Sequence, residues 1–234
     1  MTISPLKQAW VVVLLAGAGA VQAFDIPPPP PPVYQGLIFP LFPNGHTIPF
    51  SGEAGTGRGT RATASAAKPT LAQSASQVSA NAQQLAAVFP VAQRAQVAQA
   101  YVQSFDAYRQ LEAKLGIPAN DVAGAVAAFI AGNYMAYRGV EVPDDHYKRL
   151  VAQMRGALAE SRGFAAASPG DKRGLYEQMA MVGTFMAVAR QAFVQNPNPG
   201  AEKNFRDSAR ANLETALKVP ADQVRIGASG LSLQ

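Results

Sequence analysis

Apolar side chains recur at every third or fourth position between Val91 and Leu115, and polar side chains fill most of the positions between them. This spacing gathers the apolar groups on one side of a helix and therefore predicts an amphipathic α-helix. The expected buried side carries Ala95, Ala98, Val102, Phe105, Tyr108, Leu111 and Leu115. The expected polar side carries Gln93, Arg94, Gln99, Gln103, Asp106, Arg109 and Glu112. Gly116 and Pro118 follow, and both residue types end helices.

The segment Val122 to Tyr137 shows almost no polar positions, because nearly every residue is alanine, glycine, valine or another apolar type. A helix that is apolar on all sides is normally buried on all sides, so we expect a central helix here. Asn120 or Asp121 is the expected N-cap. With about 16 residues the segment is shorter than the roughly 20 that a membrane-spanning helix needs.

Four further segments have helical spacing. The first, Leu71 to Phe89, carries Leu71, Ala75, Val78, Ala82, Leu85 and Phe89 at steps of three and four. A second begins after Pro143, with Asp144 or Asp145 as its expected N-cap, and extends to Leu158. A third begins near Ser168 and Pro169 and ends before Asn196, and a fourth covers Ala201 to Leu217. The tail Val224 to Gly227 has an extended pattern with no visible partner strand.

These patterns together predict an all-α fold, a bundle of about five or six helices that fills residues 71–234.

The N-terminus has the composition of a secretory signal peptide, residues 1–23. A positive charge at Lys7 precedes the apolar run Ala9 to Ala18, and the small-residue exit Val21-Gln22-Ala23 follows. We expect cleavage after Ala23 and therefore a periplasmic or secreted protein, with no transmembrane span after cleavage. The chain contains no cysteine, which excludes a lipidated N-terminal cysteine, disulfides and Cys-ligated zinc.

Residues 24–70 form an expected Pro/Gly-rich arm, in which nine of the 18 prolines lie between Pro27 and Pro49. The run Pro27 to Pro32 favours an extended polyproline II rod. Residues 33–42 are rich in large apolar side chains, which favours burial against the protein's own helices, a partner or a membrane surface; the sequence leaves these open. The glycines between Ser51 and Lys68 lack the Gly-Lys-Ser/Thr of a P-loop and predict a flexible linker.

The formal net charge of +5 suits anionic partners, and an exported protein meets anionic lipid or cell-wall polymer more than nucleic acid. Its basic residues are scattered, without the clustered basic stripe of a nucleic-acid-binding surface, so no nucleic acid is expected as a partner. An envelope protein is the third partner class that an exported chain can meet. No cofactor motif is found, and the sequence does not indicate an oligomeric state.

Asp144-Asp145-His146 contains residue types that bind metal ions, but neighbouring residues on a helix point in different directions. We therefore interpret the aspartates as helix-terminal charges and expect no metal site. His46 is most simply a turn residue in the arm. Asn133, Tyr134, Tyr137 and Arg138 end the apolar helix and either line a pocket or act as amphipathic surface groups. Four methionines are expected as core filling: Met154, Met179, Met181 and Met186.

A short region resembles the soluble lytic transglycosylases, exported helical enzymes that cleave peptidoglycan. The similar residues are Glu160-Ser161, Ser168-Pro169-Gly170 and Gly174-Leu175-Tyr176-Glu177-Gln178, beside that family's Glu-Ser, Ser-Pro and Gly-Leu-Met-Gln signature. The resemblance implies that Glu160 is a general acid that protonates the glycosidic oxygen.

A longer region is similar to an uncharacterised family of secreted bacterial helical proteins, a domain of unknown function. The resemblance runs over most of residues 71–234 and is strongest from Leu115 to Tyr137, with Pro143-Asp144 and Gln153-Met154-Arg155 after it. It implies export and an all-α fold. It does not indicate any activity. The leading hypothesis is therefore a non-enzymatic envelope interaction module; the alternative is a peptidoglycan-cleaving enzyme that uses Glu160.

Overall fold

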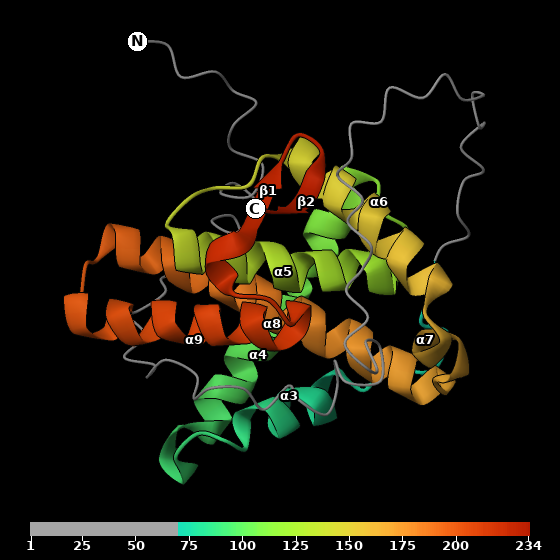
Figure 1. Cartoon of the computed structure of the whole chain (residues 1–234). Coiled ribbons are helices and arrows are strands. Elements are labelled where there is room, and N and C mark those ends of the chain that lie inside the picture. Colours follow the sequence, from blue (N-terminus) through green and yellow to red (C-terminus); the bar gives the residue numbers. More distant parts are fainter. Residues whose placement is uncertain (1–69) are drawn as a thin grey trace.

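The computed structural model describes residues 70–234, and within this range its seven α-helices confirm the predicted all-α class (Figure 1). The predicted signal peptide, residues 33–42, His46 and the predicted glycine-rich linker lie outside the described residues. The elements are α3 (Val78–Ala86), α4 (Val91–Leu115), α5 (Val122–Arg138), α6 (Asp144–Glu160), α7 (Arg162–Ala166), α8 (Pro169–Gln195), α9 (Pro199–Leu217), the 3-10 helix η3 (Ala221–Gln223), β1 (Val224–Gly227) and β2 (Gly230–Leu233).

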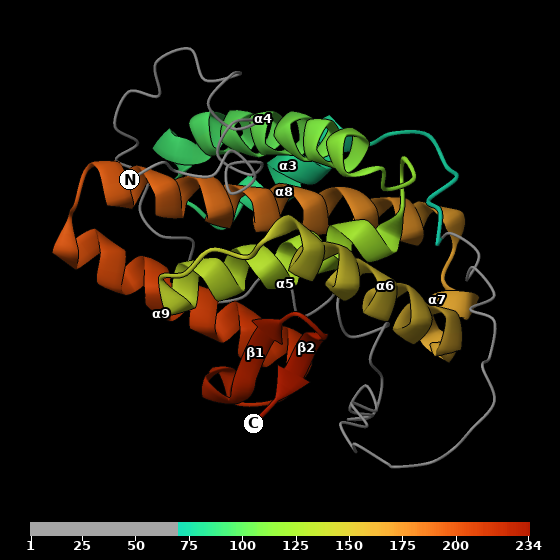
Figure 2. The same ribbon diagram turned by 90° about the horizontal axis from the view of Figure 1, so that it is seen from above.

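The apolar helix α5 is the centre of the domain, as its composition predicts. Fifteen of its 17 residues are buried, and α8, α6 and α9 all pack against it. Figure 2 shows α8 between α5 and α4, so α8 is covered on two sides. Met154, Met179, Met181 and Met186 are buried in the core, which confirms their predicted role. No helix within residues 70–234 combines the length and the apolar character that crossing a bilayer requires.

The close contact between α5 and α8 depends on two glycines. A Cβ atom at Gly132 would lie 1.9 Å from the backbone oxygen of Gly183, and a Cβ at Gly183 would lie 2.3 Å from the backbone of Ala128. Both distances are far shorter than a van der Waals contact, and the atoms that would have to move belong to the backbone. Glycine therefore lets the two helix backbones touch here.

Most predicted helix ends are confirmed. Asp121 caps α5 by accepting the Ala123 N–H, and Gly116 ends α4 with a left-handed φ of 68°. Ser168 and Asp171 form a capping box at the start of α8. The prediction for α6 was wrong: its N-cap is Pro143, and Asp144 and Asp145 lie in the first turn, where a negative charge still favours the positive end of the helix dipole.

The expected helix from Leu71 begins only at Val78, so its first half was predicted wrongly. Residues 70–77, the N-terminal strap, run extended across the ends of other helices. The strap does not form a helix because its backbone groups bond elsewhere: the Ala72 carbonyl and the Ser74 carbonyl both accept from Arg173. Leu71, an expected core residue, is exposed, and so is Ala75.

The predicted buried side of α4 is correct in its second half and wrong in its first. Ala95 is exposed and Ala98 and Val102 are only partly buried, while Val97 and Tyr101 are buried in their place. Tyr101 packs on Phe185 of α8, with ring centroids 5.3 Å apart. Val97 and Tyr101 are larger than Ala95 and Ala98, and they fill the core in place of these alanines.

The C-terminus contains a strand that the sequence pattern did not show. β1 pairs antiparallel with β2, so the tail has the partner strand that we did not expect. Gln153 of α6 supports this hairpin: its Oε1 accepts the Leu231 N–H at 2.7 Å, and its Nε2 donates to the Leu231 carbonyl at 3.2 Å. The short helix α7 is also additional, and α9 starts two residues before the predicted Ala201, with Asn198 as its cap.

Candidate functional site: a buried carboxylate at the α4–α5 junction

Several buried polar groups meet at the turn between α4 and α5, residues 116–121. We call these residues together with Glu112 the α4–α5 junction. Glu112 lies in the last turns of α4 and is only 3 % exposed. The hydroxyl of Tyr176, from α8, donates to its two carboxylate oxygens at 3.3 and 3.0 Å. Within residues 70–234 Glu112 forms no ion pair.

Burial changes the acidity of Glu112. Removal from water raises the pKa of its carboxyl group from 4.5 to about 7, and the negative charge of Asp121 acts in the same direction. Hydrogen bonds with Tyr176 and with the backbone of Asn120 and Asp121 favour the ionised form and limit the rise of the pKa. Glu112 therefore changes its charge close to neutral pH, far above the usual range of a glutamate.

Three tyrosines from three helices surround this carboxyl group: Tyr108 of α4, Tyr147 of α6 and Tyr176 of α8. Burial raises the pKa of each, most strongly for Tyr108 and Tyr147, so all three stay protonated. Tyr147 donates to the carbonyl of Gly124 at 2.9 Å. A Cβ at Gly124 would lie 2.7 Å from the Tyr108 hydroxyl, so the glycine makes room for that hydroxyl.

Asp121 follows directly and connects three parts of the fold. One carboxylate oxygen accepts the Ala123 N–H at 3.2 Å and the Thr70 hydroxyl at 2.5 Å. The other oxygen accepts two hydrogen bonds from the Arg155 guanidinium of α6. Asp121 is fully buried and Arg155 is partly exposed, so the ion pair extends from the junction to the surface.

The N-terminal strap is bound to this junction and to α8. The Ala72 N–H donates to the Asn120 carbonyl, and the Val122 N–H donates to the Thr70 carbonyl, both at 2.9 Å. Arg173 donates to the carbonyls of Ala72 and Ser74 and, at 2.8 Å, to the side-chain oxygen of Asn120. The strap and the junction thus share a set of hydrogen bonds, and neither can move far alone.

Glu177, one turn after Arg173, fixes the other end of the strap. This fully buried carboxylate accepts the Ser76 hydroxyl at 2.8 Å, the Gln77 N–H at 3.1 Å and the Asn81 amide at 2.7 Å. The Arg173 guanidinium lies 3.9 Å away and balances its charge. Three hydrogen-bond donors and the guanidinium surround the carboxylate, which makes Glu177 a structural group of the strap.

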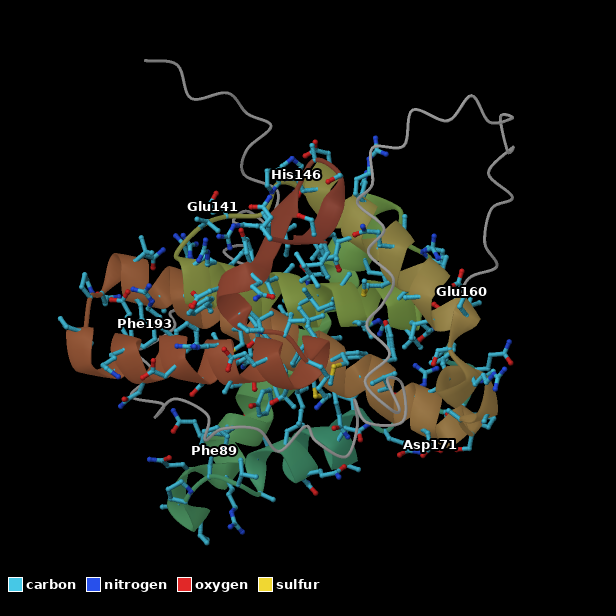
Figure 3. The ribbon with its side chains drawn as sticks, in the orientation of Figure 1. Phe89, Glu141, His146, Glu160, Asp171 and Phe193 are labelled. Atoms are coloured by element: carbon cyan, nitrogen blue, oxygen red, sulfur yellow. The ribbon has the colours of Figure 1, made fainter. Side chains whose placement is uncertain are left out.

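The junction thus has a buried carboxyl group whose pKa is raised to about 7, and its residues Asn120 and Asp121 bind the N-terminal strap. Within residues 70–234 no three His, Cys, Asp or Glu side chains are placed to bind a metal ion. Asp144, Asp145 and His146 lie at the start of α6, where Figure 3 labels His146, and the His146 imidazole is 3.9 Å from the Asp145 carboxylate.

The polar residues at the end of α5 separate from one another. Asn133 is buried and accepts from the Asn212 amide of α9 at 2.9 Å. Tyr137 and Arg138 point to the surface, where the Tyr137 hydroxyl donates to Asp222 and Arg138 lies 4.0 Å from the same carboxylate. Tyr134 is buried. These contacts are inter-helix and surface contacts within the fold.

Glu160 is the last residue of α6 and is exposed at the outer edge of the domain (Figure 3). Several other residues that resemble the lytic transglycosylase signature cap helices or form hydrogen bonds within the fold. Ser161 caps α7 and Ser168 caps α8, while Glu177 binds the strap and Gln178 donates to Asn81. The cleavage hypothesis stays a prediction; it requires peptidoglycan turnover by the wild-type chain and loss of that turnover in Glu160→Gln.

Sequence reasoning placed Glu112 on the polar side of α4 and so missed the junction. Its neighbours Leu111 and Leu115 are both on the buried side, and Glu112 lies between them at the same end of the helix. The missing signal was tertiary: Tyr176 approaches from α8, which is 64 residues away in the sequence. Asp121 was predicted as a cap, but its contacts to Thr70 and Arg155 are also long-range.

Comparisons with known proteins give one match. The sequence matches DUF6683, a family of unknown function, over residues 49–234, which includes the whole described domain and the last part of the predicted arm. No curated protein and no solved structure matches the chain. Because the match covers well over half of its length, the chain belongs to the DUF6683 family.

Proposed function

We propose that this protein is an exported, non-enzymatic interaction module of the cell envelope, in which the helical domain carries an N-terminal arm that contacts the partner. The partner classes are an envelope protein, anionic lipid and cell-wall polymer. The signal-peptide pattern of residues 1–23 and the apolar residues 33–42 support export and a contact segment.

One observation of the domain carries the proposal: the strap is fastened at both of its ends. Asp121 and Asn120 hold Thr70 and Ala72, and Glu177 holds Ser76 and Gln77. A segment with this many buried hydrogen bonds is ordered together with the core. Whatever lies before Thr70 in the chain therefore starts from a fixed point of the domain, and a load on the arm passes to α5 and α8.

The experiment compares the mature chain with a variant whose apolar segment is polar, Leu37→Ser with Ile38→Ser and Phe39→Ser. Binding is measured by co-sedimentation with purified peptidoglycan and with vesicles that contain anionic phospholipid. We expect the wild type to sediment with one of these probes and the triple variant to lose at least about tenfold in affinity, as the loss of three buried apolar side chains requires.

A matched control keeps the charge and the length of the arm. Replacing three residues of the glycine-rich stretch, Thr56→Ser, Thr60→Ser and Thr63→Ser, should leave binding unchanged. Equal binding by the wild type and the apolar-segment variant, or sedimentation of neither with any probe, contradicts the proposed role of the arm. Circular dichroism of each variant checks that the helical domain is intact.

A further inference from the structure

The α4–α5 junction places a titratable group directly beneath the attachment of the N-terminal strap. The Tyr176 hydroxyl donates to the Glu112 carboxylate, and the backbone groups of Asn120 and Asp121 act on this carboxylate by lowering its pKa. The same two residues bind the strap, through the Asn120 carbonyl and the Asp121 carboxylate. A change at Glu112 therefore acts on the groups that hold residues 70–72.

The charges around Glu112 do not compensate its ionisation. Asp121 is a second buried carboxylate, and its own partner Arg155 is already used in an ion pair. Arg173 lies with its guanidinium 5.5 Å from the ring centroid of Tyr176 and is engaged with the strap, Asn120 and Glu177. The titratable groups that interact with the charge of Glu112 are Tyr108 from α4, Asp121 at the start of α5, Tyr147 from α6 and Tyr176 from α8. The cations nearest to these groups are Arg155, which pairs with Asp121, and Arg173 and Arg109, which act on Tyr176.

An ionised Glu112 gains most by contact with water. Tyr108, Tyr147 and Tyr176 are almost completely buried, whereas Gly116, Pro118 and Ala119 of the turn are exposed, so opening the turn of residues 116–121 would bring water to Glu112. Opening this turn breaks the bonds of Asn120, Asp121 and Val122 to Thr70 and Ala72. Hydration of Glu112 and release of the strap are then the same event.

We infer that the α4–α5 junction is a proton-dependent latch, which holds the N-terminal strap while Glu112 is protonated and loosens it when Glu112 is ionised. The strap is the link between the domain and the preceding part of the chain, so the latch makes the attachment of that part sensitive to pH near neutrality. The inference uses the described domain alone and does not depend on the partner proposed above.

The size of the effect follows from linkage. A carboxyl group with a pKa of about 7 in the closed form and about 4.5 in the open form makes the opening equilibrium rise about tenfold between about pH 6 and about pH 8. The test is hydrogen exchange measured by mass spectrometry on the full chain at these two pH values, corrected for the intrinsic exchange rate. Peptides that cover residues 70–77 report on the strap, and peptides from α5 report on the core.

We expect about tenfold more opening of the strap at the higher pH in the wild type and no such rise in Glu112→Gln. Glu214→Gln is the matched control, because Glu214 is on α9 and pairs with Arg210 at the surface, and it should behave as the wild type. An equal rise in Glu112→Gln, or no rise in the wild type, overturns the latch.

A second variant keeps the inference testable if Glu112→Gln does not fold. The Tyr176 hydroxyl lowers the pKa of Glu112, so Tyr176→Phe should move the midpoint of strap opening to higher pH. A purely structural role of Tyr176 would instead increase opening at every pH with an unchanged midpoint, and that result contradicts the latch. Tyr134→Phe, a buried tyrosine of α5, is the control.

Discussion

Three carboxylates are buried in this domain, and their partners differ. Glu177 has three hydrogen-bond donors and a guanidinium nearby, and Asp121 has an ion pair with Arg155. Glu112 has a tyrosine hydroxyl and backbone groups but no cation. Burial without a cation favours the neutral form of a carboxyl group, and it raises the pKa of Glu112 to about 7.

The stability of the domain should therefore fall as the pH rises. The folded pKa of Glu112, about 7, is above its ordinary value of 4.5, so its contribution to the free energy of unfolding is full below 4.5 and is lost as the pH rises through about 7. Denaturant unfolding at about pH 5 and about pH 8 should show a lower midpoint at the higher pH in the wild type. In Glu112→Gln the difference should nearly disappear.

The surface carboxylate Glu214 is the control for this titration. Its hydrogen bond with Arg210 lowers its pKa, so its contribution is present above 4.5 and is lost only as the pH falls below that value. Glu214→Gln should therefore leave the difference between the two midpoints intact. A wild-type midpoint that stays constant or rises between these pH values would contradict the assignment to Glu112.

Asp121 should be among the most sensitive positions of the chain. Asp121→Ala removes a helix cap, the bond to Thr70 and the partner of Arg155, and the expected cost is about 3 kcal/mol of unfolding free energy. Asp145→Ala removes an exposed carboxylate from the first turn of α6 and should cost less than about 1 kcal/mol. Equal losses in the two variants, measured by urea denaturation, would show that Asp121 is not a connecting group.

At the scale of the elements, the contact of α5 with α8 gives the sharpest prediction. Gly132→Ala or Gly183→Ala would push a methyl group into the backbone of the facing helix, and each should cost at least about 2 kcal/mol. Gly156 is also in a helix but has open space around it, so Gly156→Ala should stabilise by about 0.5 to 1 kcal/mol through its better helix propensity. Thermal unfolding, followed by circular dichroism, should show a lower midpoint for Gly132→Ala and Gly183→Ala and a higher midpoint for Gly156→Ala.

The elements that the sequence predicts well are those with local causes. α4, α5 and α8 have long apolar patterns with a glycine, aspartate or serine at the right end, and their bounds agree with the structure within a residue or two. The prediction for the strap was wrong because the apolar pattern from Leu71 to Val78 also fits a helix. Contacts with Arg173 and Asn120, which lie about 50 to 100 residues away in the sequence, determine the extended conformation of the strap. A local sequence pattern does not show such contacts.

The C-terminal hairpin and the junction were missed for the same reason. β2 has only four residues, and Gln153 of α6 supplies the hydrogen bonds that hold Leu231 in place. Glu112 occupies a position that is polar by type and buried by location, so helical periodicity assigns it to the wrong side. Of the junction, only the cap Asp121 was predictable from its place before an apolar helix.

At the scale of the whole molecule, α8 connects the parts. Its N-terminal turns carry Arg173, Tyr176 and Glu177, which bind the strap and Glu112, and its middle packs against α5 at Gly183. Figure 1 shows the strap end, α6 and the start of α8 on the same side of the domain. The strap, the α4–α5 junction and the central helix α5 are thus connected through α8.

The central claim is that Glu112 gains and loses its proton near neutral pH in the folded protein, and one measurement tests it directly. The carboxyl carbon of Glu112 can be titrated by NMR in the folded full chain, with its signal identified by its absence from Glu112→Gln. We predict a midpoint of about 7, as burial without a cation requires. A midpoint near 4.5, the ordinary value of a glutamate, would contradict the account.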